Sequence, residues 1–145
     1  MDVMLEFLGL NSANTVCELL CLVVHGGCMF SKSDVEKLEK DYRRAKEALP
    51  DIEYLGGYPK YPEVISKFMN ALCAPPWFKI NYDPREVKKI MSNIDNASHD
   101  NLCNVLTNAN RIERFGDGQW AVLFVLLKED FFPLVISRAY VLTKT

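Results

Sequence analysis

The fold is decided by residues 83–116, which read DPREVKKIMSNIDNASHDNLCNVLTNANRIERFG. The run starts with Asp83-Pro84-Arg85-Glu86, which combines an N-cap residue, a first-turn proline and an acidic residue three positions after the cap. Ser98 can cap a second helix, and Gly116 is placed to end it. After each cap, apolar residues recur at steps of three and four, which predicts two amphipathic helices. The first stripe is Val87, Ile90, Met91 and Ile94, and the second is Leu102, Val105, Leu106, Ala109 and Ile112.

The same signals predict helices before this segment. Ser31 stands three positions before an acidic residue, a capping-box spacing that predicts a helix over about 34–49. A further helix is expected over about 62–73, because Pro62 suits its first turn and Pro75-Pro76 stops it. Another buried helix is expected over about 14–25.

The C-terminal part contains two apolar stretches, 120–127 and 131–142. Periodicity alone does not separate two buried helices from a two-stranded hairpin here. Helices are favoured because Pro133 fits the first turn after an Asp130 cap. The sequence therefore predicts an all-α fold, a compact single-domain helical bundle over 1–145 with about six or seven helices.

Composition and charge exclude several classes of protein. With 145 residues, 49% of them hydrophobic, and only seven prolines and seven glycines, the chain can bury a core and is neither disordered nor collagen-like. Lys and Arg number 17 against 19 Asp and Glu, and the net charge of −2 disfavours nucleic-acid binding. We expect no signal peptide, no membrane span and no membrane partner. The five cysteines lie mostly in apolar segments, which indicates reduced thiols and a cytoplasmic location.

Glu113 stands out in the second of the two helices. Positions 102, 106, 109 and 113 share one side of the helix, so Glu113 is expected to point toward the core. It also lies in the last turn, where the helix dipole disfavours an anion. A carboxylate there needs a partner, and the candidates are Arg138, Arg114 or backbone N–H groups of a helix after Gly118. We favour Arg138 or the backbone, which would make this corner a brace between helices.

Arg111 and Arg114 allow a second interpretation of the same corner. Because they are three positions apart, their guanidinium groups could converge on one carboxylate or phosphate. Cations are also favourable at a helix C-terminus without any ligand. Acid–base catalysis with Glu113 and Asp117 is a further alternative, although both histidines are far from this motif in the sequence.

Two proline-containing segments, 54–62 and 75–82, carry many aromatic residues. Rigid rings on proline-stiffened loops make good anchors for a protein partner, because they bury much area at little entropic cost. Alternatively, the rings fold down as lids over a small helical bundle; stacking on single-stranded nucleic acid is disfavoured by the acidic balance. The candidate anchors are Tyr58, Tyr61, Trp77, Phe78 and Tyr82.

Cys17, Cys21, His25 and Cys28 recur at steps of three or four and could in principle supply four metal ligands. The spacing lacks the short paired knuckle of structural zinc sites, and small cysteines in a buried helix explain it more simply. We therefore expect no metal and no cofactor.

Residues 106–118 read LTNANRIERFGDG. The pattern is Leu-Thr, an arginine four positions after the threonine, an acidic residue, Arg-Phe, one spacer, an acidic residue and glycine. In this pattern, the chain from about Tyr61 onward resembles a family of bacterial, archaeal and phage proteins catalogued as domain of unknown function 6508. The spacer, often cysteine in that family, is Gly116 here. The resemblance implies a small helical domain and carries no assigned activity.

Taken together, these features predict a non-enzymatic helical protein-binding module, of a kind that a phage or mobile element could encode, which docks on a host protein. The apolar stretch 120–142 also allows self-association into a homo-oligomer. The alternative is an enzyme or a small-anion- or nucleotide-binding protein that uses Arg111, Glu113, Arg114 and Asp117.

Overall fold

The computed structural model describes residues 28–115, 127 and 129–144. Its described part is mostly helical, as predicted, but holds five α-helices rather than six or seven, together with a small two-stranded hairpin that the sequence analysis did not predict. The helices expected over 14–25 and 120–127 lie outside the described residues, apart from Leu127. The helices are α3 (Lys32–Glu47), α4 (Glu63–Leu72), α5 (Val87–Ser92), α6 (His99–Phe115) and α8 (Phe131–Leu142), and the strands are β1 (Glu53–Leu55) and β2 (Tyr58–Lys60).

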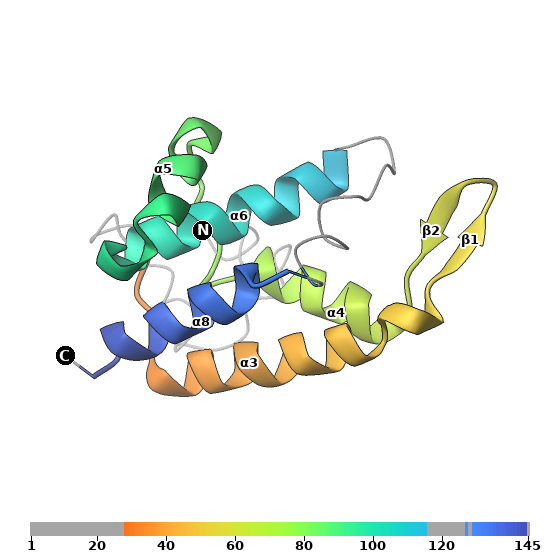
Figure 1. Ribbon diagram of the computed structural model, residues 1–145, viewed down its shortest axis with the longest axis horizontal. Coiled ribbons are helices and arrows are strands. Elements are labelled where there is room, and N and C mark those ends of the chain that lie inside the picture. Colours follow the sequence, from red (N-terminus) through yellow and green to blue (C-terminus); the bar gives the residue numbers. More distant parts are fainter. Residues whose placement is uncertain (1–27, 116–126, 128, 145) are drawn as a thin grey trace, which may run out of the picture.

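Four of the helices pack around one core. α3 and α8 lie side by side along one edge, α6 runs along the opposite edge, and α4 lies between α3 and α6 (Figure 1). α5 packs on the N-terminal part of α6, and the β1–β2 hairpin projects from the other end of the molecule (Figure 1). The hairpin is therefore the described element that extends farthest from the helical body.

Aromatic rings from three helices meet at the centre of this core. Tyr42 of α3, Phe68 of α4 and Phe132 of α8 are all buried. The ring centroids of Phe68 and Phe132 are 5.1 Å apart, and those of Tyr42 and Phe132 are 5.4 Å apart, distances typical of favourable aromatic pairs. On α3 the apolar residues that recur at steps of three and four are buried; they are Val35, Leu38, Tyr42 and Ala45. Leu49, the next residue in this spacing, is half-buried and lies beyond the end of the helix.

Local signals set where the helices start. Ser31 forms the predicted capping box: its hydroxyl accepts from the backbone N–H of Asp34 at 3.2 Å, and its own N–H donates to the Asp34 carboxylate at 2.7 Å. Asp83 likewise accepts from the N–H of Arg85 at 2.9 Å, but the turn that follows is 3₁₀ (η2, Pro84–Glu86) and α5 ends at Ser92. The predicted 131–142 helix is confirmed, with Pro133 in its first turn.

α8 has one buried apolar face, while Leu134 and Val141 are exposed at 46% and 47%. Phe132, Val135, Ile136 and Ala139 are buried within the chain, and self-association through 120–142 stays a prediction. Residues 120–126 lie outside the described part. Among the residues that the structure describes, no helix has both the length and the apolar character needed to cross a membrane.

Candidate functional site

Five polar side chains of α6 are buried. Buried polar groups destabilise a fold unless they are hydrogen-bonded, so the contacts of these side chains show what the helix holds in place. Four of them bind the segment 61–83, which runs past α6 in the opposite direction. We call this set the α6 polar ladder; its members are Asn104, Thr107, Asn110 and Glu113. The fifth residue, Asn108, has a buried Oδ1 without a hydrogen-bond partner among the described residues.

Asn104 and Thr107, the two members of the ladder nearer the N-terminus of α6, hold the loop between α4 and α5. The Asn104 side chain binds both backbone groups of Asp83: its Oδ1 accepts from the N–H at 2.7 Å, and its Nδ2 donates to the carbonyl at 2.9 Å. The Thr107 hydroxyl accepts from the N–H of Lys79 at 2.8 Å and donates to the carbonyl of Trp77 at 3.3 Å. The proline-containing loop is thereby fixed to α6 through its backbone.

Asn110 and Glu113, the two members nearer the C-terminus of α6, hold α4 and Tyr61, which precedes it. Nδ2 of Asn110 donates to the carbonyl of Met69 at 2.7 Å, and the Cys73 thiol donates to Oδ1 of Asn110 at 2.8 Å. At the C-terminal end of the ladder, the Tyr61 hydroxyl donates to Oε1 of Glu113. Burial, together with this hydrogen bond to Glu113, raises the pKa of Tyr61 well above its usual range.

The structure assigns Glu113 a partner that the sequence analysis did not consider. Glu113 is buried, as its helical position predicted, with 8% of its surface exposed. Its described contact is Tyr61, which had been predicted as an anchor for a protein partner. Arg138, one of the two favoured partners, donates from Nε to the carbonyl of Ala97 at 2.8 Å, and the other, the backbone after Gly118, lies outside the described residues. The Arg114 side chain and Asp117 lie outside the described residues.

Arg111 also has a packing role. Its guanidinium lies over the ring of Phe78, 5.3 Å from the ring centroid, which is within cation–π range. Arg111 and Phe78 are both half-buried. The structure thus joins one residue of the predicted anion site to one of the predicted partner-binding rings, and the contact fixes the 75–82 loop against α6.

The predicted aromatic surface divides into buried and exposed residues. Trp77 is buried in the core against Phe30, with ring centroids 4.8 Å apart, so it is not available as an anchor on the surface. Tyr61 and Tyr82 are half-buried. Tyr58 is the one member of the predicted set that is largely exposed, at 60%. For Trp77, folding inward as a lid is therefore the correct alternative.

Tyr58 lies on the β1–β2 hairpin, whose turn is built from two glycines. Gly56 and Gly57 have φ angles of +60° and +86°, and positive angles at both central positions define the tight turn that suits a two-residue hairpin. The strands pair Leu55 with Tyr58 and Tyr54 with Pro59. Two glycines flanked by apolar residues are a recognised hairpin signal, from which this hairpin could have been predicted.

The residues on either side of the Gly56–Gly57 turn have large hydrophobic side chains that are exposed to solvent. Tyr54 is 50% exposed, Leu55 62% and Tyr58 60%. We call these three residues and the two glycines between them the hairpin tip. Leu55 and Tyr58 are paired across the strands and share one face, whereas Tyr54 shares the other face with Pro59. The tip is therefore apolar on both faces.

Cysteines in the described part do not form a metal site. Cys28 and Cys103 are both buried, and their thiols interact; the contact lowers the pKa of Cys28 and, together with burial, raises that of Cys103. The described residues contain no cluster of three or more His, Cys, Asp or Glu side chains suited to a metal ion. Cys17, Cys21 and His25 lie outside them, so the four-ligand set stays untested.

No family model, no curated protein and no solved structure matches this chain. The resemblance of residues 106–118 to domain of unknown function 6508 stays a prediction. The described part of that motif has a clear structural role, because Thr107, Asn110 and Glu113 all belong to the α6 polar ladder.

Proposed function

We propose that this domain is a protein-binding module that inserts its hairpin tip into an apolar cleft of another protein. The observation that carries the proposal is the exposure of Tyr54, Leu55 and Tyr58, each at least half exposed and all within five residues. Single exposed hydrophobic residues are common on protein surfaces, but a cluster of large ones marks an interaction site. Tyrosine is also among the residues that contribute most to binding at protein interfaces.

The shape of the hairpin tip favours a cleft over a flat partner surface. Its apolar side chains lie on both faces, so a flat surface would cover only one face and leave the other in water. The turn is also sterically open, since a Cβ placed on Gly56 or Gly57 would meet nothing within 4 Å. A narrow, convex element of this kind buries most area when the partner encloses it.

The charge of the hairpin supports a protein partner rather than a nucleic acid. Lys60 is its only cation, and it pairs with Glu53 on the opposite strand at 3.3 Å. The net charge of the whole chain is −2. Phosphate backbones are held chiefly by clusters of unpaired cations, which the hairpin lacks.

The alternative function, anion binding or catalysis at the C-terminal end of α6, has less support. The Glu113 carboxylate is buried and receives the Tyr61 hydroxyl, and the Arg111 guanidinium packs on Phe78. Both side chains thus have structural contacts that hold neighbouring segments in place.

A photo-crosslinking experiment tests the proposal. The full chain is expressed in its native host with p-benzoylphenylalanine in place of Leu55, and the crosslinked partner is identified and purified. Its affinity for the unmodified chain is then measured by calorimetry. We expect Leu55→Ala and Tyr58→Ala each to weaken binding at least about tenfold, the effect of losing about 1.4 kcal/mol of interface contact.

Ile80→Ala is the matched control, because Ile80 is 82% exposed and lies on the 73–83 loop rather than the hairpin. It should leave the affinity unchanged. The proposal is refuted if Leu55→Ala and Tyr58→Ala bind as tightly as the unmodified chain, or if Ile80→Ala weakens binding equally. Crosslinking only between copies of this chain, confirmed by sedimentation, would replace the proposed partner with a homo-oligomer.

A further inference from the structure

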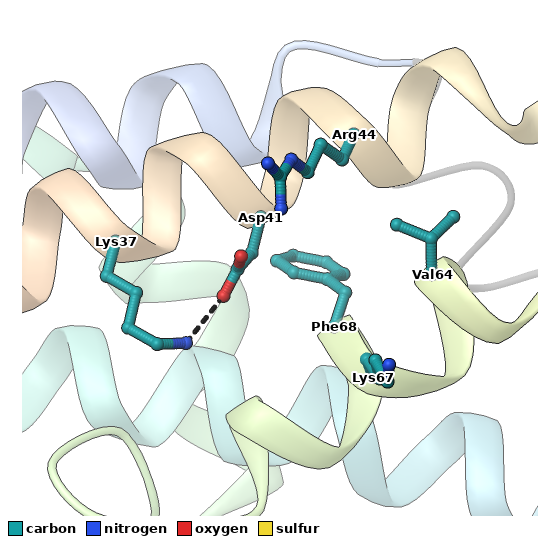
Figure 2. Close-up of a pocket in the computed structure, with 6 residues that line it drawn as sticks. All are labelled: Lys37, Asp41, Arg44, Val64, Lys67 and Phe68. Carbon is teal, nitrogen blue, oxygen red and sulfur yellow. Dashed lines mark hydrogen bonds and ion pairs between the residues drawn. The ribbon is translucent and has the colours of Figure 1, made fainter.

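A groove of about 290 Å³ lies between α3 and α4, away from the hairpin tip. Its lining side chains come from α3 and α4, and Figure 2 shows how they lie. The buried ring of Phe68 forms its floor, next to the half-buried side chain of Val64. The lining residues are Lys37, Asp41, Arg44, Val64, Lys67 and Phe68.

The groove is positive, although the chain as a whole is negative. Its lining contains three cations and one carboxylate, and the Glu63 carboxylate that pairs with Lys67 leaves a local net charge of +1, against −2 for the whole protein. Lys37 pairs with Asp41 at 2.7 Å, as Figure 2 shows, and Lys67 pairs with Glu63 at 2.7 Å. Arg44 has no ion-pair partner among the residues that the structure describes.

Arg44 is therefore the cation best placed to bind an external anion. A guanidinium presents its N–H groups as a planar fork that matches the oxygens of a carboxylate or phosphate. The two lysines can add to this contact at little cost, because exposed ion pairs such as Lys37–Asp41 and Lys67–Glu63 contribute little to stability. A ligand's oxygens can thus replace the present partners of both lysines.

We infer that this groove binds a small phosphate monoester that carries a ring or a short branched apolar group. A phosphate monoester has a charge near −2 at neutral pH, which is opposite in sign to that of the groove. Its apolar group would pack on the half-buried Val64, beside the buried edge of Phe68. The volume lies at the lower end for ligand pockets, which limits the ligand to a small molecule.

Titration of the isotope-labelled full chain with phenyl phosphate tests the inference, with amide chemical shifts as the readout. We expect saturable shifts confined to residues 37–44 and 64–68, with a Kd on the order of 1 mM. Inorganic phosphate, which lacks the ring, and benzoate, which has one charge fewer, should each bind at least about fivefold more weakly. Equal binding of all three compounds, or no shifts in these two segments, would overturn the inference.

Two substitutions with opposite expected effects sharpen the test. Arg44→Gln should weaken phenyl phosphate binding about tenfold or more, whereas Asp41→Asn should strengthen it two- to threefold, because it removes the competing carboxylate. Arg43→Gln is the matched control: Arg43 is the preceding residue on α3 and is occupied by Glu39 at 2.5 Å. Unchanged thermal unfolding confirms that each variant is folded. Equal weakening by Arg43→Gln and Arg44→Gln would show a general charge effect and refute the site.

Discussion

The contact between Tyr61 and Glu113 gives the sharpest prediction. Tyr61→Phe removes only the hydroxyl that donates to a carboxylate with 8% exposed surface. A hydrogen bond to a charged group contributes about 1.5–3 kcal/mol, and the lower end applies here because Tyr61 is only half-buried. We therefore expect Tyr61→Phe to lower the free energy of unfolding by about 1–2 kcal/mol near pH 7.

The pH dependence provides a second, independent signature. The pKa of Tyr61 is raised in the folded state, so above roughly pH 10 the unfolded tyrosine loses its proton while the folded one keeps it. The unfolded state then binds fewer protons, and this contribution to stability falls as the pH rises. The difference in stability between the unmodified chain and Tyr61→Phe should thus shrink above pH 10, by at most about 1.4 kcal/mol per pH unit.

The assay is urea unfolding followed by circular dichroism at several values between pH 7 and 11. Comparing the two chains at each pH matters because Tyr140 also titrates late: its hydrogen bond to Glu39 raises the pKa of Tyr140 to about 12. Tyr58→Phe is the control, since it makes the same chemical change at a side chain that is 60% exposed, and it should change stability by less than about 0.5 kcal/mol. Parallel pH profiles and equal stability of Tyr61→Phe and the unmodified chain would refute the proposed role of this contact.

Three further substitutions test the packing of the core and the ladder. Asn104→Ala removes both hydrogen bonds to the backbone of Asp83, so it should cost about 1–2 kcal/mol in urea unfolding and accelerate hydrogen exchange at the Asp83 amide. Trp77→Ala leaves a cavity in the core and should cost about 3–5 kcal/mol; an unchanged melting temperature would contradict its burial. Tyr42→Phe removes a buried hydroxyl that has no hydrogen-bond partner among the described residues, so it should be neutral or stabilise the protein by up to about 1 kcal/mol, and a clear loss of stability would reveal a partner.

Local sequence signals explain why most of the helices were predictable. The Ser31 capping box and the apolar stripe of α3 act within one helix, so their effect does not depend on the rest of the fold. Burial of Glu113 was predictable for the same reason, because helical periodicity alone places it beside Leu102, Leu106 and Ala109. Asp83 shows the limit of such signals: it starts the expected turn, but α5 extends only to Ser92.

Partners of the buried polar groups were not predictable. Tyr61 and Glu113 are 52 positions apart, and Asn104 and Asp83 are 21 apart, with no pattern in the sequence that links them. Exposure of the loop aromatics was likewise undetermined, because Trp77 and Tyr58 both lie beside prolines, yet one packs on Phe30 and the other projects from the hairpin.

By itself, the sequence determined the helical character of the chain, the starts of its main helices and most of the inward face of α3 and α6, because caps and periodicity act over a few residues. Ile112, predicted in the α6 stripe, is an exception and is 42% exposed. Only the tertiary structure decided which segments pair. It placed Tyr61 on Glu113, formed the groove between α3 and α4, and left the hairpin tip exposed. The physical reason is that hydrogen-bond donors and apolar surfaces accept many partners of the same chemistry, and the packing of the whole chain selects among them.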